Sequence, residues 1–228
     1  MEVANGESVS TSAVALKNYN AAKSNYLAQA GDTTAAWKFA RACADWADSV
    51  ENNEQRAATA EEGIEAGKFA TEMAPTNAAG FYYLALNYGE LARTKTIGAL
   101  SLVNKMEHAL IKAIQLDPTL DHAGPDRSLG ILYRDAPGRP ASIGNKSKAE
   151  EHLKNAVRLT ADYPDNYLSL LEAYAKWKDA NQFHATAAQY KGIVSIAKKK
   201  YSGPEWEGPW HDWEERWRAV RQKIQNEG

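Results

Sequence analysis

The stretch DRSLGILY, residues 126–133, decides the fold. Counted from Asp126, the residues Leu129, Gly130 and Tyr133 recur at three- and four-residue spacing, which places them on one face of an expected helix. A large ring can wedge between helices on such a face, and a glycine lets a partner helix approach closely. The same face recurs elsewhere in the chain, so we expect a fold built from repeated helix pairs.

Four stretches carry this first-helix face at spacing i, i+3, i+4, i+7. They are Trp37, Ala40, Arg41 and Ala44; Phe81, Leu84, Ala85 and Tyr88; Asp126, Leu129, Gly130 and Tyr133; and Tyr167, Leu170, Leu171 and Tyr174. A second helix follows each of the first three and again places small or apolar residues on one face: Gly63, Gly67 and Ala70; Met106, Leu110 and Ala113; Ala149, Leu153 and Ala156. A proline then ends each of these three pairs, at Pro75, Pro118 and Pro164.

The first-helix spacing resembles the tetratricopeptide pattern W-x2-L-G-x2-Y, and MAPTN at 73–77 and LDPTL at 116–120 resemble the endings of that repeat. The anchors Trp37, Phe81, Asp126 and Tyr167 are 44, 45 and 41 residues apart, whereas the standard repeat spans about 34. HEAT-type repeats have longer periods and are the alternative architecture. We prefer the tetratricopeptide type because Leu-Gly-x2-Tyr is specific and the loop DAPGRPASIGN at 135–145 accounts for added length.

The resulting expectation is an all-α, right-handed superhelix of about four helix pairs, with a lead-in helix, a capping helix and a concave inner face. Residues 1–10 are expected to be a disordered arm, and residues 11–228 a single domain. The expected helices cover residues 11–30, 33–50 and 54–73, 78–94 and 99–116, 124–135 and 146–160, 165–179 and 182–200, and 209–225.

Composition excludes several classes of protein. The formal net charge of −2 argues against nucleic acid as a partner, and no apolar run approaches the ~20 residues that span a bilayer. Cys43 is the only cysteine, so an internal disulfide and a cysteine-based zinc site are excluded. The first residues do not form a signal peptide. We therefore expect a cytoplasmic protein, or an exported one whose signal was removed.

The sequence lacks the motifs of catalysis. It contains no nucleophile elbow, Walker loop or dinucleotide fingerprint. Its five histidines include no pair at the His-x3-His spacing that directs two metal ligands to one helical face. We expect neither an enzyme nor a cofactor or metal.

A binding surface is expected on the concave groove, at first-helix positions that follow each anchor. Its mixture of aromatic, aliphatic and charged side chains suits a protein partner or a small organic ligand. These residues differ from the carboxylate clamp of co-chaperone repeats. A homo-oligomer of this chain is a further alternative that the sequence leaves open. The candidate binding residues are Lys38, Trp46, Tyr82, Leu86, Glu90, Arg127, Ile131, Arg134 and Glu172.

The polar cluster at residues 121–127 allows two interpretations. Arg127 and Arg134, seven residues apart, could face a ligand carboxylate together. Alternatively, Asp121 or Asp126 caps a helix and Arg127 forms a structural ion pair. The second interpretation is preferred.

The stretch DHAGPDRSLGILYRDAPGRPASIGNKSKAEEHLKNAVRL at 121–159 resembles the T-component family of TRAP transporters. That resemblance implies a periplasmic or envelope-associated, tetratricopeptide-like accessory protein. It would bind a small hydrophobic or acidic ligand, or the transporter's substrate-binding protein. The lipidation cysteine and export signal of that family are missing here. A general protein–protein interaction scaffold unrelated to transport is the alternative.

Four of the seven tryptophans gather near the C-terminus. Trp210, Trp213 and Trp217 form a stripe at i, i+3, i+7 on the last expected helix. The stripe either caps the open end of the last repeat or docks another subunit or a partner. Capping is preferred, because an exposed stripe of three tryptophans would promote aggregation.

Overall fold

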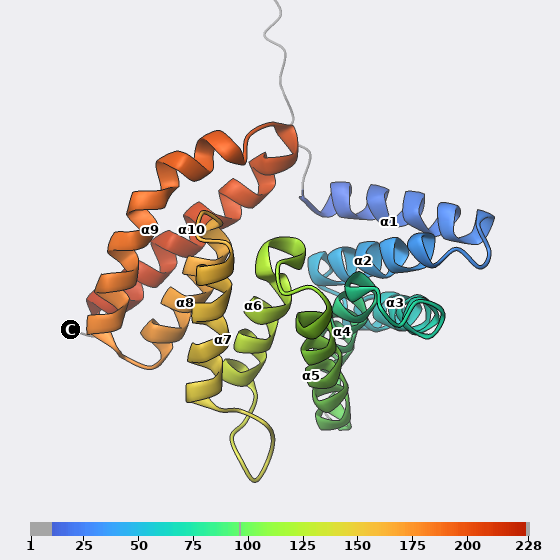
Figure 1. The fold of residues 1–228 in the computed structure, drawn as a ribbon, viewed down its shortest axis with the longest axis horizontal. Coiled ribbons are helices and arrows are strands. Elements are labelled where there is room, and N and C mark those ends of the chain that lie inside the picture. Colours follow the sequence, from blue (N-terminus) through green and yellow to red (C-terminus); the bar gives the residue numbers. More distant parts are fainter. Residues whose placement is uncertain (1–10, 96, 227–228) are drawn as a thin grey trace, which may run out of the picture. The chain divides into compact units, whose positions relative to one another are not determined.

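Ten α-helices make up the described part of the chain, residues 11–95 and 97–226 of the computed structural model (Figure 1). They are α1 (Thr11–Ala28), α2 (Thr33–Ser49), α3 (Asn53–Met73), α4 (Ala78–Arg93), α5 (Ala99–Leu116), α6 (Leu120–Asp135), α7 (Lys146–Leu159), α8 (Pro164–Lys176), α9 (Ala180–Lys200) and α10 (Pro204–Asn226). The expectation of an all-α fold is thereby confirmed, and the expected arm at 1–10 lies outside the described residues.

The helices form two compact units, which we describe separately: residues 1–116 with α1 to α5, and residues 117–228 with α6 to α10. Within each unit, the first helix of a pair packs on the first helix of the next pair. In unit 1, α2 contacts α4; in unit 2, α6 contacts α8, and α8 contacts α10. This is the neighbour relation that the repeat pattern predicts. The expectation of a single domain over 11–228 stays a prediction.

Helix starts follow from side chains that accept the first free backbone N–H groups. Asn52 caps α3, Asn77 caps α4 and Asn145 caps α7, each accepting a backbone N–H through its side chain. Pro164 occupies the first turn of α8, where its missing N–H costs nothing. The last helix begins at Pro204, earlier than the expected 209, because that proline takes the first-turn position and Pro209 lies inside the helix.

Small residues allow α3 to approach α4 closely in unit 1. A Cβ atom on Gly63 would lie 2.1 Å from Asn87 Oδ1, and one on Gly67 would lie 2.9 Å from Leu84 Cβ. The buried Asn87 amide donates to the backbone oxygen of Ala40 on α2 at 2.8 Å. The pair α3–α4 is thus tied to α2 by a hydrogen bond as well as by packing.

Cys43 lies on the buried side of α2 and is 0% exposed. Burial raises the pKa of its thiol, and the charge of Glu62 acts in the same direction. The thiol is therefore held in its neutral form in the folded unit.

The pair α6–α7 contains the stretch DRSLGILY and the second-helix residue Leu153. Leu129, Gly130, Tyr133 and Leu153 are all buried, as expected. A Cβ atom on Gly130 would lie 2.6 Å from Leu153 Cγ, so only glycine permits this approach. Tyr88, Ala156, Leu170 and Tyr174, which belong to the same repeated helix faces, are buried as well.

The C-terminal helix α10 covers α8 with part of its tryptophan stripe. Trp213 is 2% exposed and packs edge-on against Tyr163 at 5.3 Å between ring centroids. Trp210 and Trp217 are half-buried against the same apolar cluster. Trp213 therefore acts as the expected cap, whereas its two neighbours keep part of their surface exposed.

Candidate functional site

The predicted binding residues divide between the two units. Lys38 and Trp46 lie on α2, and Tyr82, Leu86 and Glu90 lie on α4, all in unit 1. Arg127, Ile131 and Arg134 lie on α6, and Glu172 lies on α8, all in unit 2.

In unit 1, the two aromatic candidates are core residues. Tyr82 is 2% exposed and Trp46 is 8% exposed, so both lie beneath the surface and support the exposed residues of this face. Lys38 is exposed, and its ammonium group lies 5.7 Å from the Trp37 ring centroid. Leu86 is half-buried. The part of the predicted surface that a partner can reach in unit 1 therefore centres on Lys38, Leu86 and Glu90.

Glu90 is a half-buried carboxylate that faces cations from two helices. Arg56 Nε of α3 lies 3.6 Å from it, and Arg93 Nη1 of α4 lies 2.9 Å from it. Burial raises the pKa of Glu90, with a contribution from the charge of Asp48, against the lowering effect of both arginines. Glu90 is thus a partly shielded charge rather than a freely solvated one.

In unit 2, Arg127 lies at the centre of a buried polar cluster. Its Nε is 3.1 Å from Asp165 Oδ2, and its Nη1 donates to Asn166 Oδ1 at 2.9 Å. The guanidinium group also lies over the Tyr163 ring, 5.4 Å from the centroid. These contacts agree with the preferred interpretation of Arg127 as a structural ion pair.

This cluster stabilises an unusual turn at the start of α6. Asp121, His122 and Ala123 have positive φ angles of 49°, 57° and 62°, a conformation that costs a non-glycine residue about 1–2 kcal/mol. The His122 carbonyl accepts a hydrogen bond from Asn166 Nδ2 at 3.0 Å, and the His122 ring stacks on Tyr163 with centroids 4.2 Å apart. The regular part of α6 consequently begins after Ala123, as the sequence predicts.

Asn166 was not identified from the sequence, although it is 0% exposed and holds this turn in place. Its amide also donates to the backbone oxygen of Ala156 on α7 at 3.0 Å. An asparagine two residues after Pro164 resembles an ordinary residue of a helix start, so no sequence pattern marks it.

Arg134 and Glu172 do come together, through a third residue contributed by α10. Arg134 Nη1 lies 3.3 Å from Glu172 Oε2, and Arg216 Nε lies 2.7 Å from Glu172 Oε1. Arg216 Nη1 continues to Asp165 Oδ1 at 2.8 Å, and Asp165 in turn meets Arg127. Alternating charges therefore connect α6, α8 and α10 on the predicted groove face.

The electrostatics of this chain of charges favour its ionised form. Burial opposes ionisation of Asp165, but Arg127 and Arg216 hold the pKa of its carboxyl group below the usual value. Burial likewise works against the charge of Arg216, yet Asp165 and Glu172 raise the pKa of its guanidinium group. Both cations that the sequence assigned to ligand recognition, Arg127 and Arg134, thus bind carboxylates of the chain itself.

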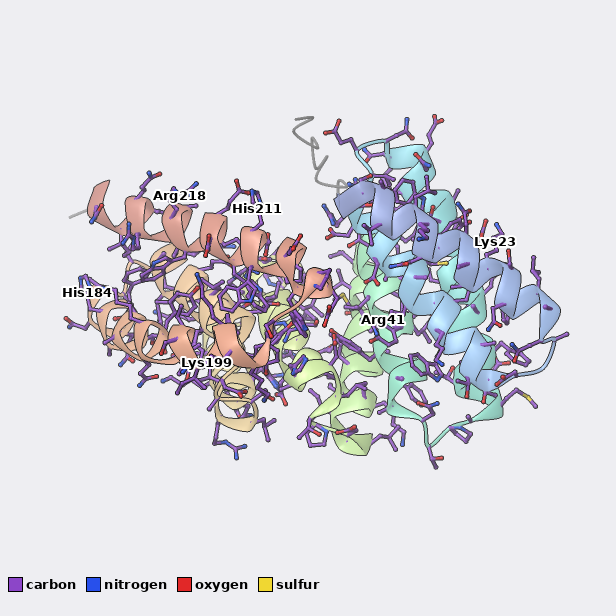
Figure 2. All side chains as sticks on the ribbon, turned by 90° about the horizontal axis from the view of Figure 1, so that it is seen from above. Lys23, Arg41, His184, Lys199, His211 and Arg218 are labelled. Carbon is purple, nitrogen blue, oxygen red and sulfur yellow. The ribbon has the colours of Figure 1, made fainter. Side chains whose placement is uncertain are left out.

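A groove that the sequence did not predict runs between α9 and α10 in unit 2. Figure 2 labels His184 and Lys199 on α9 and His211 and Arg218 on α10, the two helices that form its walls. Two adjoining hollows of about 550 and 250 Å³ make up the groove and share Lys198, Trp210 and Glu214. The smaller hollow is lined in addition by Tyr190, Lys191, Val194 and Trp217.

Aromatic side chains form the floor of this α9–α10 groove. The Tyr190 and Trp217 ring centroids are 4.9 Å apart, and Trp210 Nε1 donates to the backbone oxygen of Tyr201 at 2.7 Å. Lys198 Nζ reaches across to Glu214 Oε1 at 2.9 Å. The tryptophan stripe was the one sequence signal that pointed here, because the part of it that does not cap α8 lines the groove.

Within residues 11–95 and 97–226, no group of three His, Cys, Asp or Glu side chains is arranged to hold a metal ion. The helices of this same part are also too short or too polar to cross a membrane. Both units consist of helices stacked into faces and grooves.

Comparisons with known proteins place this architecture in the tetratricopeptide-like class. The crystal structure of TTC0263, a thermophilic TPR protein of Thermus thermophilus, is similar, with a TM-score of 0.65 at 20% identity, covering 92% of this chain and 93% of that one. The crystal structure of MamA is similar with a TM-score of 0.51 at 16% identity, covering 84% of this chain and 96% of that one. At these identities the likeness establishes the fold.

The family is defined by a sequence match. The family model described as Regulator of microtubule dynamics protein 1-3 matches residues 4–123, more than half of the 228 residues. The chain belongs to this family. No curated sequence matches it. None of these matches is a T-component of a TRAP transporter, so that resemblance has no support beyond the residues quoted for it.

Proposed function

We propose that this chain is a non-catalytic scaffold that binds a protein component of the microtubule system, the tubulin polymer itself. The observation that carries the proposal is the family match over residues 4–123, which includes nearly all of unit 1. A stack of helix pairs suits this role, because it presents a broad face of fixed side chains to a partner. The expectation of a general protein-interaction scaffold is retained, and the family name supplies the kind of partner.

The surface proposed for the partner is the first-helix face of unit 1. Lys38 and Leu86 offer an exposed cation and a half-buried apolar side chain, and Glu90 adds a carboxylate shielded by Arg56 and Arg93. Such a mixture of an apolar patch and charged edges is typical of protein–protein contacts. In unit 2, Ile131, Arg134 and Glu172 remain candidates for a contact beside α10.

A co-sedimentation experiment tests the proposal directly. The full chain is mixed with polymerised tubulin and pelleted, and we expect saturable recovery of the chain in the pellet. Lys38→Glu should weaken this binding several-fold, because it reverses a charge on the proposed face. Lys68→Glu is the matched control: Lys68 is an equally exposed lysine, on α3, and its reversal should leave binding unchanged.

Two outcomes would contradict the proposal. A folded chain that stays in the supernatant at all tubulin concentrations rules out direct binding to the polymer. Equal weakening by Lys38→Glu and Lys68→Glu would show a diffuse charge effect instead of a defined face.

The role of a transporter accessory for a small acidic ligand has no observation in its favour. The expected carboxylate ligand would have to compete with Asp165 for Arg127 and with Glu172 for Arg134. Removing one partner of such a shielded ion pair is costly. We therefore propose protein binding as the function, and we do not propose a role in the transport of a small ligand.

A further inference from the structure

We propose that the α9–α10 groove binds an amphipathic helix of a partner protein, a helix with an apolar stripe between one acidic and one basic flank. This inference rests on the protein-binding function proposed above and names the chemistry of the partner. The groove lies outside residues 4–123, the part of the chain that the family model matches.

Unit 1 shows how a helix of this chain packs on an apolar cluster that two other helices share. There, Ala60 and Ile64 of α3 share an apolar cluster with Leu84, Tyr88 and Leu91 of α4. The next helix, α5, places Leu102 and Met106 against that cluster. Two residues four apart on one helix thus pack on the apolar cluster that the two preceding helices share.

The pair α9–α10 has the same order along the chain as α3–α4, a second helix followed by the first helix of the next pair, but α3 and α4 pack directly on each other whereas α9 and α10 have almost no direct backbone contact. Tyr190, Val194 and Lys198 recur every four residues along α9 and line the groove, and Trp210, Glu214 and Trp217 face them from α10. The two walls therefore present straight rows of side chains over an aromatic floor, on which a helix with an apolar stripe can lie.

The charges of the two walls differ, and they define the flanks of the occupant. The α9 wall contributes Lys191 and Lys198, whereas the α10 wall contributes Glu207 and Glu214. A helix lying in the groove would accordingly carry acidic residues toward α9 and basic residues toward α10. Charge complementarity of this kind fixes the direction in which the helix lies.

The ion pair between Lys198 and Glu214 spans the groove, and a partner can replace it at little cost in free energy. The Lys198 and Glu214 side chains are 53% and 56% exposed, so their pairing contributes little to stability. A partner helix would replace this one ion pair by two, one on each wall. The binding energy would come mainly from covering Val194, Trp210 and Trp217, since aromatic residues dominate such contacts.

Fluorescence anisotropy with synthetic peptides tests the proposal. The probe is a dye-labelled peptide with the 18-residue length of α5, leucine at alternating three- and four-residue spacing, glutamate on one flank and lysine on the other. We expect the full chain to bind this peptide, and to bind a scrambled peptide of the same composition at least about tenfold more weakly. A peptide with lysine on both flanks should bind with intermediate affinity.

Charge-reversal variants make the test specific for the groove. Lys198→Glu and Glu214→Lys should each lower the affinity about fivefold, and the double variant should also stay weaker than the unchanged chain, because Lys191 and Glu207 keep the original charges of the two walls. Lys199→Glu is the matched control: it reverses the next residue of α9, which is exposed and does not line the groove. All of these charge-reversed positions are exposed, and unchanged thermal melts would establish that the variants fold.

The proposal is overturned if the mixed-flank peptide does not bind, if the scrambled peptide binds equally well, or if Lys198→Glu has no effect. It is also overturned if sedimentation shows a dimer that Val194→Asp dissociates while no peptide binds, since the occupant is then a second copy of the chain. No tubulin is present in this assay, so failure here and failure of the microtubule proposal are separate results.

Discussion

Replacing Gly130 by alanine isolates the contact on which the α6–α7 pair depends. In an ordinary helix interior, this change stabilises by about 1 kcal/mol, because alanine has the higher helix propensity. At position 130, however, the new methyl carbon would lie 2.6 Å from Leu153 Cγ, 3.0 Å from Leu153 Cδ2 and 3.1 Å from the Ala149 carbonyl oxygen. Leu153 is fully buried and the carbonyl belongs to the α7 backbone, so neither can move away freely.

Overpacking of this kind costs about 1–3 kcal/mol, which exceeds or cancels the gain in propensity. Gly192→Ala is the matched control, because Gly192 lies inside α9 of the same unit and an added Cβ meets nothing within 4 Å. We expect Gly192→Ala to stabilise by up to ~1 kcal/mol and Gly130→Ala to be neutral or destabilising. The difference between the two variants, about 1–3 kcal/mol, is then the packing cost itself.

Urea and thermal unfolding followed by far-ultraviolet circular dichroism measures both variants. For a unit of this size, a change of about 1 kcal/mol moves Tm by roughly 4 °C. Gly130→Leu should cost at least as much as Gly130→Ala, and adding Leu153→Val to Gly130→Ala should destabilise less than the sum of the two single changes. Equal stabilisation by Gly130→Ala and Gly192→Ala would refute the close approach of α6 and α7.

Three further predictions concern unit 2. Asn166→Leu leaves the His122 carbonyl without this donor and removes one acceptor of Arg127, so it should lower the free energy of unfolding by at least about 2 kcal/mol. The control Asn181→Leu, at an exposed site, should change the free energy of unfolding by less than about 0.5 kcal/mol. Equal urea midpoints for the two variants would contradict the structural role of Asn166. Trp213→Ala should lower the free energy of unfolding by about 3–5 kcal/mol. Truncation after Tyr201 should give a chain that aggregates, which light scattering can detect. A truncated chain that is soluble and equally stable would show that α10 is not a cap. Because the pKa of Asp165 is lower in the folded than in the unfolded chain, the stabilisation by its ionised carboxyl group is complete above about pH 4 and is lost as the pH falls further. Asp165→Asn should therefore lower the free energy of unfolding at about pH 7 and weaken its dependence on pH in the acid range. Parallel curves of stability against pH for the two proteins would disprove this linkage.

The helix pairs could be predicted from the sequence because their signals are local. Gly130 and Tyr133 recur at helical spacing, and Pro164 marks a helix start that needs no information from elsewhere in the chain. The clearest error in a boundary concerns the last helix, which was expected to begin near residue 209, whereas Pro204 already occupies its first turn. Such local patterns also predicted the burial of Trp213 as a cap.

The surroundings of the candidate residues could not be predicted in the same way. Asn166 lies 44 positions from the carbonyl it holds, that of His122, and Arg216 lies 44 positions from Glu172. No spacing rule links residues that meet only after α6, α8 and α10 have packed together. The α9–α10 groove was missed for a related reason, since a groove depends on how far two helices stand apart and not on either helix alone.

The single cysteine makes the opening of unit 1 measurable by chemical labelling. Because Cys43 is fully buried and its thiol is held neutral, an alkylating reagent can modify the chain only when α2 separates from its neighbours. The rate of labelling under native conditions therefore measures how often unit 1 opens, with no engineered probe. Five of the seven tryptophans belong to unit 2, so intrinsic fluorescence follows mainly that half of the chain. Recording both signals in one denaturant series would show whether the two units unfold together or one after the other.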